Sequence, residues 1–452
     1  MFNSVLIANR GEIALRIART CREMGLRTIA VYSTPDRDSP VVRFADEAVH
    51  IGPAAIRHSY LNIPAIIEAG KATGAEAIHP GYGFLSEDPD FAEICEMEGL
   101  TFIGPPPGLI AQFGDKAEAR KLMAEAGLPV LPGSERALES TEARELADAI
   151  GFPVILKACA GGGGRGLSVV HSLRDFPQAY RNARATANAA FNDGRVYLER
   201  FVENARHIEI QVLCDNHGNV LHLGERDCSV QRRHQKLVEE TPAPGLAPDL
   251  AGRMAAGAME AARRLGYRGL GTFEFLVDEL GRFYFMEINC RIQVEHPVTE
   301  MVTGLDLVRE QIRVAGGLPA SVSQSDISLR GVAIECRLNA EDPEKGFTPT
   351  PGTLTEFVPP AGPFIRTDSH ATTGYTIPAE YDSLLAKIVS WGPDRQQALN
   401  RMTRALGELR VSGPGIRTTL TFIEEVITHP AYQDGKHTTA LVQKLISERK
   451  ER

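Results

Sequence analysis

A dense group of ionisable side chains occupies residues 283–300, whose sequence is FYFMEINCRIQVEHPVTE. The segment opens with three aromatic residues, which is typical of a buried β-strand. An unpaired carboxylate at Glu287 would be strongly destabilising in such a strand. We therefore expect Glu287 to meet a cation, and a metal ion is the obvious candidate.

A second carboxylate, Glu274, lies in the earlier strand-like run GTFEFLVD. Strand alternation places it on the face opposite its aromatic neighbours. Two adjacent strands could therefore aim Glu274, Glu287 and Asn289 at one point. A few hard oxygen ligands, with room left for water and phosphate oxygens, suit Mg²⁺ better than Zn²⁺ or Ca²⁺. A cross-strand ion pair remains the alternative for either glutamate alone.

The composition indicates a globular protein with more than one domain. The 452 residues are enough for roughly two to four domains of ~100–200 residues each. No apolar run approaches the ~20 residues needed to cross a bilayer, and an early acidic residue interrupts any signal-like segment. We therefore expect a cytoplasmic protein without a membrane partner.

Charge and cysteine usage exclude other classes. The net charge of -9 argues mildly against a nucleic-acid partner, although local basic clusters could serve small anions. The seven cysteines are odd in number and form no C-x-x-C pair, so that neither a disulfide framework nor a zinc site is expected.

Short apolar runs alternate with amphipathic stretches over the first ~110 residues, a βαβ rhythm that predicts a parallel sheet. The first turn reads ANRGE and lacks the G-x-G-x-x-G that brings a dinucleotide close to the backbone. A Rossmann-like sheet without a dinucleotide is the better interpretation. A proline-rich break at 105–107 precedes a predicted helix near Asp115, where we place a domain boundary.

A glycine-rich segment follows the apolar strand that ends at Lys157: the sequence LKACAGGGGRG has glycines at 161–164. The lysine precedes the glycines, so this is not a P-loop. A mobile flap over nucleotide phosphates is the functional interpretation, and a plain flexible hairpin is the alternative. Lys116 is a second candidate for phosphate binding, or else an ordinary surface lysine.

Two polar segments lie between these motifs. HIEIQVLCD, which starts at His207, alternates polar and apolar residues, so one strand face is wholly polar. The following run, ERDCSVQRRHQKLVEE, crowds basic residues between acidic ones. Such charge runs usually form a solvated face, but its position between two candidate site strands favours an anion-binding wall.

Seven motifs, taken together and in order, strongly resemble those of biotin carboxylases, which belong to the ATP-grasp superfamily. They are HPGYGFLSE, GDK, LKACAGGGGRG, ERDCSVQRRHQK, GTFEF, FMEINCRIQVEHPVTE and AIECRLNAEDP. The resemblance implies an α/β and α+β protein with three domains. These are an N-terminal Rossmann-like domain (1–114), an ATP-grasp domain (115–330) with a mobile lid (about 131–203), and a C-terminal biotin carboxylase domain (331–452).

The resemblance also implies roles for individual residues. ATP would be held by Lys116, Lys157, Gly163, Gly164, the hinge residues Glu199, Arg200, Phe201 and Val202, and by His207, Gln231 and His234, with Glu274 and Glu287 acting through the metal. Glu274, Glu287 and Asn289 would bind Mg²⁺, or Mn²⁺ in its place. Lys236, Arg291 and Val294 would hold bicarbonate, Glu295 would be the general base, and Arg337 would face the ureido ring of biotin.

The implied activity is the ATP-dependent carboxylation of biotin by bicarbonate, through carboxyphosphate. No Met-Lys-Met biotin attachment motif occurs, so we expect a free-standing subunit that acts on biotin carried by a separate carrier protein, alongside carboxyltransferase subunits. Bacterial acetyl-CoA carboxylase, in fatty acid synthesis, is the favoured setting. Pyruvate, other acyl-CoA and urea carboxylases use similar subunits and remain alternatives.

The resemblance further suggests a homodimer, with Arg19, Glu23 and Arg366 at the family's interface positions, although Phe364 is shifted by one. Two departures from the family pattern are Cys290, where a small hydroxyl residue or alanine is common, and a glycine run one residue shorter than in some relatives. Neither removes a functional group.

Two other functions deserve weight. Another ATP-grasp carboxylate ligase would share the ATP and Mg²⁺ groups, but RIQVEH and ECR serve bicarbonate and biotin rather than an amine. A catalytically silent, nucleotide-binding paralogue is the non-enzymatic alternative. The intact Lys236, Arg291, Glu295 and Arg337 argue against it.

Overall fold

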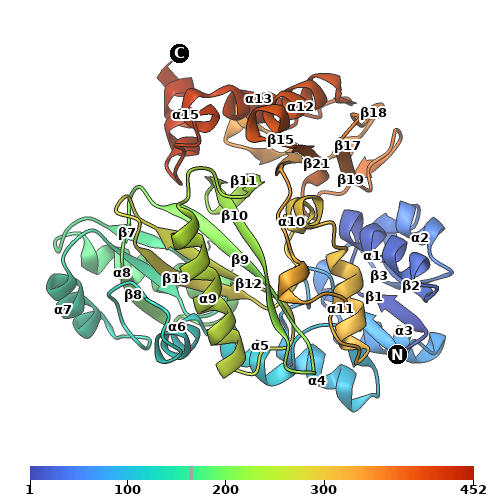
Figure 1. The fold of residues 1–452 in the computed structure, drawn as a ribbon, viewed down its shortest axis with the longest axis horizontal. Helices are drawn as coiled ribbons and strands as arrows, with labels where there is room; N and C mark the ends of the chain where they lie inside the picture. Colours follow the sequence, from blue (N-terminus) through green and yellow to red (C-terminus); the bar gives the residue numbers. More distant parts are fainter. Residues whose placement is uncertain (162–165, 452) are drawn as a thin grey trace.

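A computed structural model describes residues 1–161 and 166–451 of the chain (Figure 1). It confirms the expected mixture of parallel and antiparallel sheets with flanking helices. Among the described residues, no helix combines the length and apolar character needed to span a bilayer.

The N-terminal region is built on a five-stranded sheet in the order β3-β2-β1-β4-β5, and every neighbouring pair is parallel. Its strands are β1 (Ser4–Ile7), β2 (Arg27–Ser33), β3 (Glu47–Gly52), β4 (Ala77–His79) and β5 (Thr101–Phe102), and its helices are α1 (Gly11–Glu23), α2 (Pro40–Phe44), α3 (Ile63–Thr73) and α4 (Pro89–Met97). All four residues of β1 are buried. The βαβ rhythm of the sequence therefore predicted this sheet correctly.

Two helices, α5 (Pro107–Gly114) and α6 (Lys116–Glu125), lead out of this region. The Asp115 side chain accepts hydrogen bonds from the backbone N–H groups of Ala117 and Glu118, at 3.1 and 3.2 Å. This N-cap starts α6 where a helix was expected and fixes Lys116 at its first residue.

A three-stranded antiparallel sheet of order β7-β6-β8 forms a separate body at the left of Figure 1. Its elements are α7 (Ser140–Ile150), β6 (Val154–Ala158), β7 (Ser168–Val170), α8 (Phe176–Phe191) and β8 (Val196–Arg200). The two helices and three strands share a small apolar core of their own. This body lies within the segment that we expect to be the lid.

The largest element is an eight-stranded antiparallel sheet of order β13-β12-β9-β10-β11-β14-β21-β19. Its strands are β9 (Arg206–Cys214), β10 (Val220–Arg232), β11 (Gln235–Thr241), β12 (Gly269–Val277), β13 (Phe283–Asn289), β14 (Val332–Asn339), β19 (Ile365–Ser369) and β21 (Leu384–Gly392). Because β14 pairs with β11, the sheet runs without a break across the boundary expected at 330/331.

The two faces of this sheet differ sharply. Helix α9 (Pro248–Arg264) packs on β9 and β10, on the face where Ile208 of β9 and Phe273 and Phe275 of β12 contribute to a large apolar core. The opposite face of β9 to β12 carries polar and charged side chains that are nevertheless buried. Helices α10 (His296–Thr303) and α11 (Leu307–Ala315) follow β13, and α10 packs against β10, β11, β14 and β21.

The C-terminal region adds helices to the far end of the sheet. Its remaining elements are β15 (Glu341–Asp342), β16 (Thr348–Pro349), β17 (Gly352–Thr353), β18 (Glu356–Val358), β20 (Thr376–Ile377), α12 (Arg395–Glu408), β22 (Arg410–Ser412), α13 (Leu420–Thr428), α14 (Pro430–Gln433) and α15 (Leu441–Glu451). Helices α12 and α13 share an apolar core with β11, β14 and β21.

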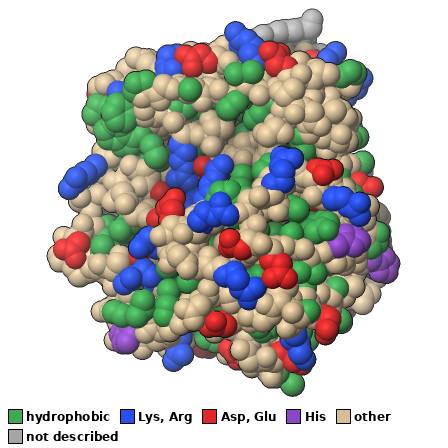
Figure 2. Space-filling view, turned by 90° about the vertical axis from the view of Figure 1, so that its right-hand side faces the viewer, with side chains coloured by type: hydrophobic (Ala, Val, Ile, Leu, Met, Phe, Trp, Pro, Cys, Tyr) green, Lys and Arg blue, Asp and Glu red, His purple; other side chains and the backbone are tan. Residues whose placement is uncertain are grey.

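Figure 2 shows basic side chains gathered near the centre of one face, so the net negative charge is not evenly spread.

Candidate active site

The Lys236 ammonium group on β11 lies at the centre of a cluster of buried carboxylates. Its Nζ donates to Glu274 Oε1 at 3.0 Å and to Glu295 Oε1 at 2.7 Å, and it also contacts Glu209. Burial opposes the charged form, but the three glutamates raise the pKa of Lys236 well above its ordinary value. The lysine is therefore a fixed positive charge within this carboxylate cluster.

Arg226 on β10 supports this cluster from within the sheet. Its guanidinium is fully buried and donates to Glu209 Oε2 at 2.9 Å, with further bonds to Gln211 and Thr299. Burial would raise the pKa of Glu209, but Lys236 and Arg226 bring it well below the usual value. The polar face predicted from HIEIQVLCD is thus buried, and its Glu209 and Gln211 are held by charged hydrogen bonds from Arg226.

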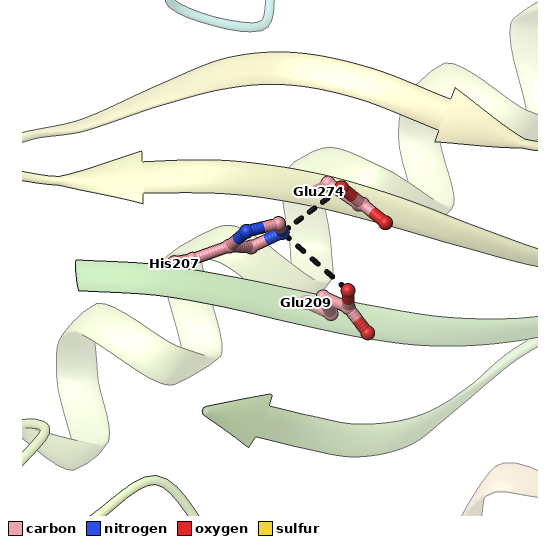
Figure 3. Close-up of side chains that lie close together, drawn as sticks. All are labelled: His207, Glu209 and Glu274. Carbon is pink, nitrogen blue, oxygen red and sulfur yellow. Dashed lines mark ion pairs between the residues drawn. The ribbon is translucent and has the colours of Figure 1, made fainter. Parts of the chain in front are cut away.

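His207 points from β9 toward the same carboxylates, as Figure 3 shows. Its Nε2 lies 2.9 Å from Glu274 Oε2 and 3.4 Å from Glu209 Oε1, while Gln231 approaches Nδ1 at 2.5 Å. Burial disfavours the imidazolium, but Glu274 and Glu209 raise the pKa of His207 to about 9. Sequence reasoning named His207 and Gln231, and the structure brings them together.

Glu274 and Glu287 are direct cross-strand neighbours on β12 and β13, and Asn289 pairs with Thr272 one step further along. The Asn289 amide donates to Glu274 Oε1 at 2.7 Å, and the Lys116 ammonium contacts Glu287. Burial opposes ionisation, but Lys116 lowers the pKa of Glu287 to about 2. The structure thus pairs Glu274 with Glu287 across adjacent strands and joins Asn289 to Glu274, and their role as metal ligands stays a prediction.

This donor set fits a hard divalent cation. Two ionisable carboxylates and one amide side chain on adjacent strands offer the oxygen ligands that Mg²⁺ prefers, with space for non-protein ligands. His207, Glu209 and Glu274 form a second group whose ligand atoms lie within 4.8 Å of one another. Its imidazole nitrogen suits transition metals better than Mg²⁺.

Arg291 lies next to the carboxylate pair, in the loop after β13. Its guanidinium donates to Glu87 Oε2 at 2.8 Å and to Asn289 Oδ1 at 3.0 Å. Glu87 comes from the N-terminal region and also accepts the backbone N–H of Cys290 at 2.9 Å. The motif HPGYGFLSE, which ends at Glu87, therefore holds the segment that carries Arg291.

Glu295 immediately precedes α10 and is fully buried. It accepts from Lys236 through Oε1 and from Arg337 Nη2 through Oε2 at 2.8 Å. Burial would raise the pKa of Glu295, but Lys236 and Arg337 keep it below the ordinary value. A carboxylate that is ionised and held between two cations can accept a proton only from a substrate placed beside it.

Other candidate nucleotide-binding residues lie outside the Lys236 cluster, on the body built around the β7-β6-β8 sheet, which we call the lid body. Lys157 on β6 contacts Glu199 on β8, which also accepts from Arg120 Nε at 2.9 Å. Arg200 instead donates to the carbonyls of residues 150 and 151 at 3.0 and 3.2 Å, so its guanidinium is engaged with the lid. Phe201 and Val202 follow β8 and are half-buried, while Gly163 and Gly164 fall outside the described residues.

The basic run before Lys236 divides into three environments. Arg226 pairs with Glu209 inside the sheet, and Arg232 pairs with Glu341 at 3.1 Å. Arg233 and His234 occupy the β10–β11 turn with positive φ and are exposed. Only part of the run can therefore form the anion-binding wall that its composition suggests.

One fully buried lysine escaped the sequence reasoning. Lys387 on β21 donates to the carbonyl of Val294 at 2.9 Å and pairs with Glu12 Oε1 at 2.9 Å. Tyr82 also donates to Glu12. Lys387 thus ties the loop before Glu295 to the N-terminal region, a role that no local sequence signal reveals.

The positions expected at a dimer interface are spread over two elements. Arg19 and Glu23 are exposed on α1. Arg366 on β19 pairs within the chain, with Glu300 and Asp368 at 2.6 Å each. Phe364 is 51% exposed and its ring lies 5.0 Å from that of Trp391.

Comparisons with known proteins agree with this geometry. Family models match residues 1–110 (Biotin carboxylase, N-terminal domain), 115–322 (Carbamoyl-phosphate synthase L chain, ATP binding domain) and 335–444 (Biotin carboxylase C-terminal domain). The chain is 54% identical to a biotin carboxylase of a Nostoc species, covering 98% of this chain and 99% of that protein.

Two solved structures extend the match. One is a biotin carboxylase complex with a β,γ-ATP ligand from Campylobacter jejuni, with TM-score 0.96, 48% identity, and 98% and 99% coverage of the two chains. The other is the biotin carboxylase domain dimer of Hydrogenobacter thermophilus 2-oxoglutarate carboxylase with MgADP, ADP and bicarbonate, with TM-score 0.95, 46% identity and 98% coverage of each chain. The chain belongs to the biotin carboxylase family of ATP-dependent, ATP-grasp enzymes.

Proposed function

We propose that this chain carboxylates biotin on a separate carrier protein, as the first half-reaction of acetyl-CoA carboxylase in fatty acid synthesis. Membership of the family supports the use of ATP and bicarbonate. The observation that carries the proposal is the continuous link from Lys236 through Glu295 to Arg337. This link supports the assignment of Glu295 as a base between the candidate bicarbonate site and the candidate biotin site.

In the first step, a bicarbonate oxygen attacks the γ-phosphorus of ATP, and the bond to the ADP oxygen breaks. Glu295 takes the bicarbonate proton, while Lys236 and Arg291 hold the anion and the backbone near Val294 limits its position. The product is carboxyphosphate. Positioning and charge neutralisation dominate phosphoryl transfer of this kind, which explains the density of fixed cations.

The metal would be held by Glu274, Glu287 and Asn289. When bound, Mg²⁺ neutralises charge on the phosphate oxygens. Lys116 and Lys236 contact the two carboxylates and add positive charge beside them. We assign Lys116 and Lys157 to the ATP phosphates, with Gly163 and Gly164 as the closing loop and 199–202 as the adenine hinge.

In the second step, carboxyphosphate breaks into CO₂ and phosphate. Phosphate takes the proton from biotin N1′, and that nitrogen attacks CO₂ to give carboxybiotin. Arg337 stabilises the negative charge that develops on the ureido oxygen. Exclusion of water by the lid protects carboxyphosphate from hydrolysis.

The proposal is tested by ADP release with Mg²⁺, ATP and bicarbonate, measured with and without free biotin, for the wild type and Glu295→Gln. We expect biotin to stimulate turnover only when bicarbonate is present, and the variant to lose about 10²–10⁴-fold, as for loss of a general base. Turnover that ignored both substrates would instead favour another ATP-grasp ligase.

The carboxyl acceptor needs a separate test, because the carboxyltransferase partner determines which acceptor is carboxylated. The match to a 2-oxoglutarate carboxylase domain makes a different carboxylase the second candidate. Purified carrier proteins and carboxyltransferases of the acetyl-CoA and 2-oxoacid systems, each supplied in turn, distinguish them. Transfer to acetyl-CoA alone supports the proposal, and transfer to a 2-oxoacid replaces it.

We also propose a homodimer in the cytoplasm. The related domain dimer supports the assembly, and the exposed Arg19 and Glu23 supply charges for an interface. Sedimentation of the wild type and of Arg19→Glu tests it. A monomeric wild type would contradict the proposal, and a shift toward monomer in the variant would support it.

A further inference from the structure

Two buried carboxylates behind the candidate base have no part in the steps above. Glu239 on β11 and Glu335 on β14 are direct cross-strand neighbours of an antiparallel pair, and neither side chain is exposed. Opposite side chains of such a pair have Cβ atoms about 4.5–5.5 Å apart. The two buried side chains are therefore close neighbours on the same face of the sheet.

The hydrogen-bond donors around this pair are few. Arg337 Nη2 lies 2.5 Å from Glu239 Oε1. Apart from this ion pair, the four carboxylate oxygens of Glu239 and Glu335 have no partner among the described residues. Two adjacent, buried, ionised carboxylates would repel each other and leave these lone pairs unsatisfied.

The charged groups that face the pair come from four places. They are Arg337 on β14, Lys387 on β21, Lys236 on β11 and Glu295 before α10. Lys387 is already engaged by Glu12 and by the Val294 carbonyl, and Lys236 by its own three glutamates. Of these three cations, Arg337 is the one with a direct ion pair to a member of the pair, and it also contacts Glu295 at 2.8 Å.

We propose that Glu335 is a protonated carboxylic acid that donates a hydrogen bond to Glu239, so that Glu239 stays ionised and positions the Arg337 guanidinium. Burial supports this arrangement, because it raises the pKa of Glu335 well above its ordinary value and that of Glu239 to about 7. One shared proton joins one oxygen of each carboxyl group, removes their mutual repulsion and leaves a single negative charge opposite the arginine.

The arrangement has a consequence for the reaction. Arg337 bridges Glu239 and Glu295 through one nitrogen, so Glu239 continues to hold the arginine when Glu295 takes a proton and loses its charge. Glu239 is therefore a positioning residue for the second step. The inference rests on the proposed function, in which Arg337 faces biotin.

Infrared spectroscopy detects the proton directly and without turnover. We expect the carbonyl stretching band of a protonated carboxylic acid in the wild type at neutral pH, and its loss in Glu335→Gln. Glu240→Gln is the matched control, because Glu240 is the next residue on β11 but faces the other way and pairs with Arg395 at 2.8 Å. An identical band in the wild type and Glu335→Gln overturns the proposal.

Kinetics separate the two carboxylates. Glutamine at 335 mimics the neutral acid, so both ADP release without biotin and its stimulation by biotin should stay within about threefold. In Glu239→Gln, biotin stimulation should fall about tenfold or more, as for loss of one charged hydrogen bond, while ADP release without biotin changes little.

Glu239→Asp keeps the charge on a shorter side chain and should lie between the wild type and Glu239→Gln. Equal damage from glutamine at 239 and at 335, or loss of both rates together, overturns the positioning role. If biotin did not stimulate the wild type at all, the proposed function would be contradicted. The infrared experiment would still test the protonation of Glu335, because it does not depend on turnover.

Discussion

The two faces of the eight-stranded sheet are built from the same strands but are stabilised in opposite ways. One face of β9 and β12 contributes Ile208, Phe273 and Phe275 to an apolar core. The other carries Glu209 and Glu274, which are equally inaccessible but belong to a network of ions. Burial is therefore uninformative about function, whereas the chemical type of what is buried separates scaffold from site.

The comparison also shows why the charged face stays in place. Each apolar side chain contributes roughly in proportion to its buried area and tolerates local change. Each charge depends on partners that must all be present, because a lone buried ion is far more costly than a paired one. Variants on the two faces should therefore differ in whether stability and activity change together.

The largest loss of stability is expected from Phe275→Ala. Phe275 is fully buried and packs edge-on against Phe283 and Phe285, with ring centroids 5.6 and 6.2 Å away. Removing such a ring costs about 3–5 kcal/mol. Chemical denaturation followed by circular dichroism measures this loss, and biotin-stimulated turnover per folded molecule should be largely unchanged.

The half-buried Phe283 gives the control for that variant. Phe283→Ala should cost clearly less, because part of its ring already meets solvent. Equal losses of stability at 275 and 283 would contradict the role of burial. A large loss of turnover in the folded fraction of Phe275→Ala would show that the apolar face also affects activity.

Arg226→Met tests the charged face and should cost about 3 kcal/mol, because it leaves Glu209 with fewer buried partners. Unlike the phenylalanine variant, it should also lower turnover per folded molecule, since Glu209 contacts Lys236. Denaturation and ADP release are measured on the same samples.

The double variant Arg226→Met with Glu209→Gln sharpens this test. Removing both charges together should restore part of the stability lost in Arg226→Met alone, which is the coupling that a double-mutant cycle measures. Simple addition of the two single losses would mean that the pair is not a unit.

A smaller effect, on pH dependence, is expected at Asp368, where the charged face continues to β19. Burial opposes ionisation, but Arg366 and Lys387 lower the pKa of Asp368 to about 2. A carboxylate whose folded pKa is lowered stabilises the protein above its unfolded pKa and loses that contribution as pH falls through the folded value. Between about pH 5 and pH 2, the wild type should therefore lose about 2 kcal/mol more than Asp368→Asn. Parallel stability curves for the two proteins would contradict this assignment.

Local patterns predicted the parts of the molecule that depend on near neighbours. The apolar runs of β1 and β2 predicted the parallel N-terminal sheet, and strand alternation predicted that Glu274 faces away from the aromatic residues and meets Glu287. The change of pattern after the proline-rich break predicted a helix near Asp115, and the cap formed by Asp115 begins α6 there. In each case the physical cause lies within a few residues of its effect.

The parts that sequence reasoning missed depend on pairing between distant segments. Nothing near Glu239 or Glu335 indicates that β11 joins β14, and the pair exists only through that register. The sequence grouped the fully buried Arg226 with a basic run expected to form an anion-binding wall, whereas the structure pairs it with Glu209 inside the sheet. Composition alone could not separate these structural ions from the cations of the site.

The smallest effect is expected from an ion pair that resembles the buried ones in geometry but lies in solvent. Arg136 and Glu142 are joined by two hydrogen bonds of 3.2 and 2.9 Å, yet their side chains are 65% and 50% exposed. Water and salt screen such a pair, and holding two long side chains costs entropy. We therefore expect Glu142→Gln to leave the denaturation midpoint and turnover unchanged within error, although the contact distances match those of Arg226 and Glu209. A measurable loss of stability that disappears at high salt would mean that this pair helps to hold the lid body in place. In that case, the position of an ion pair in the fold, rather than its exposure to solvent, would decide how much it stabilises the protein.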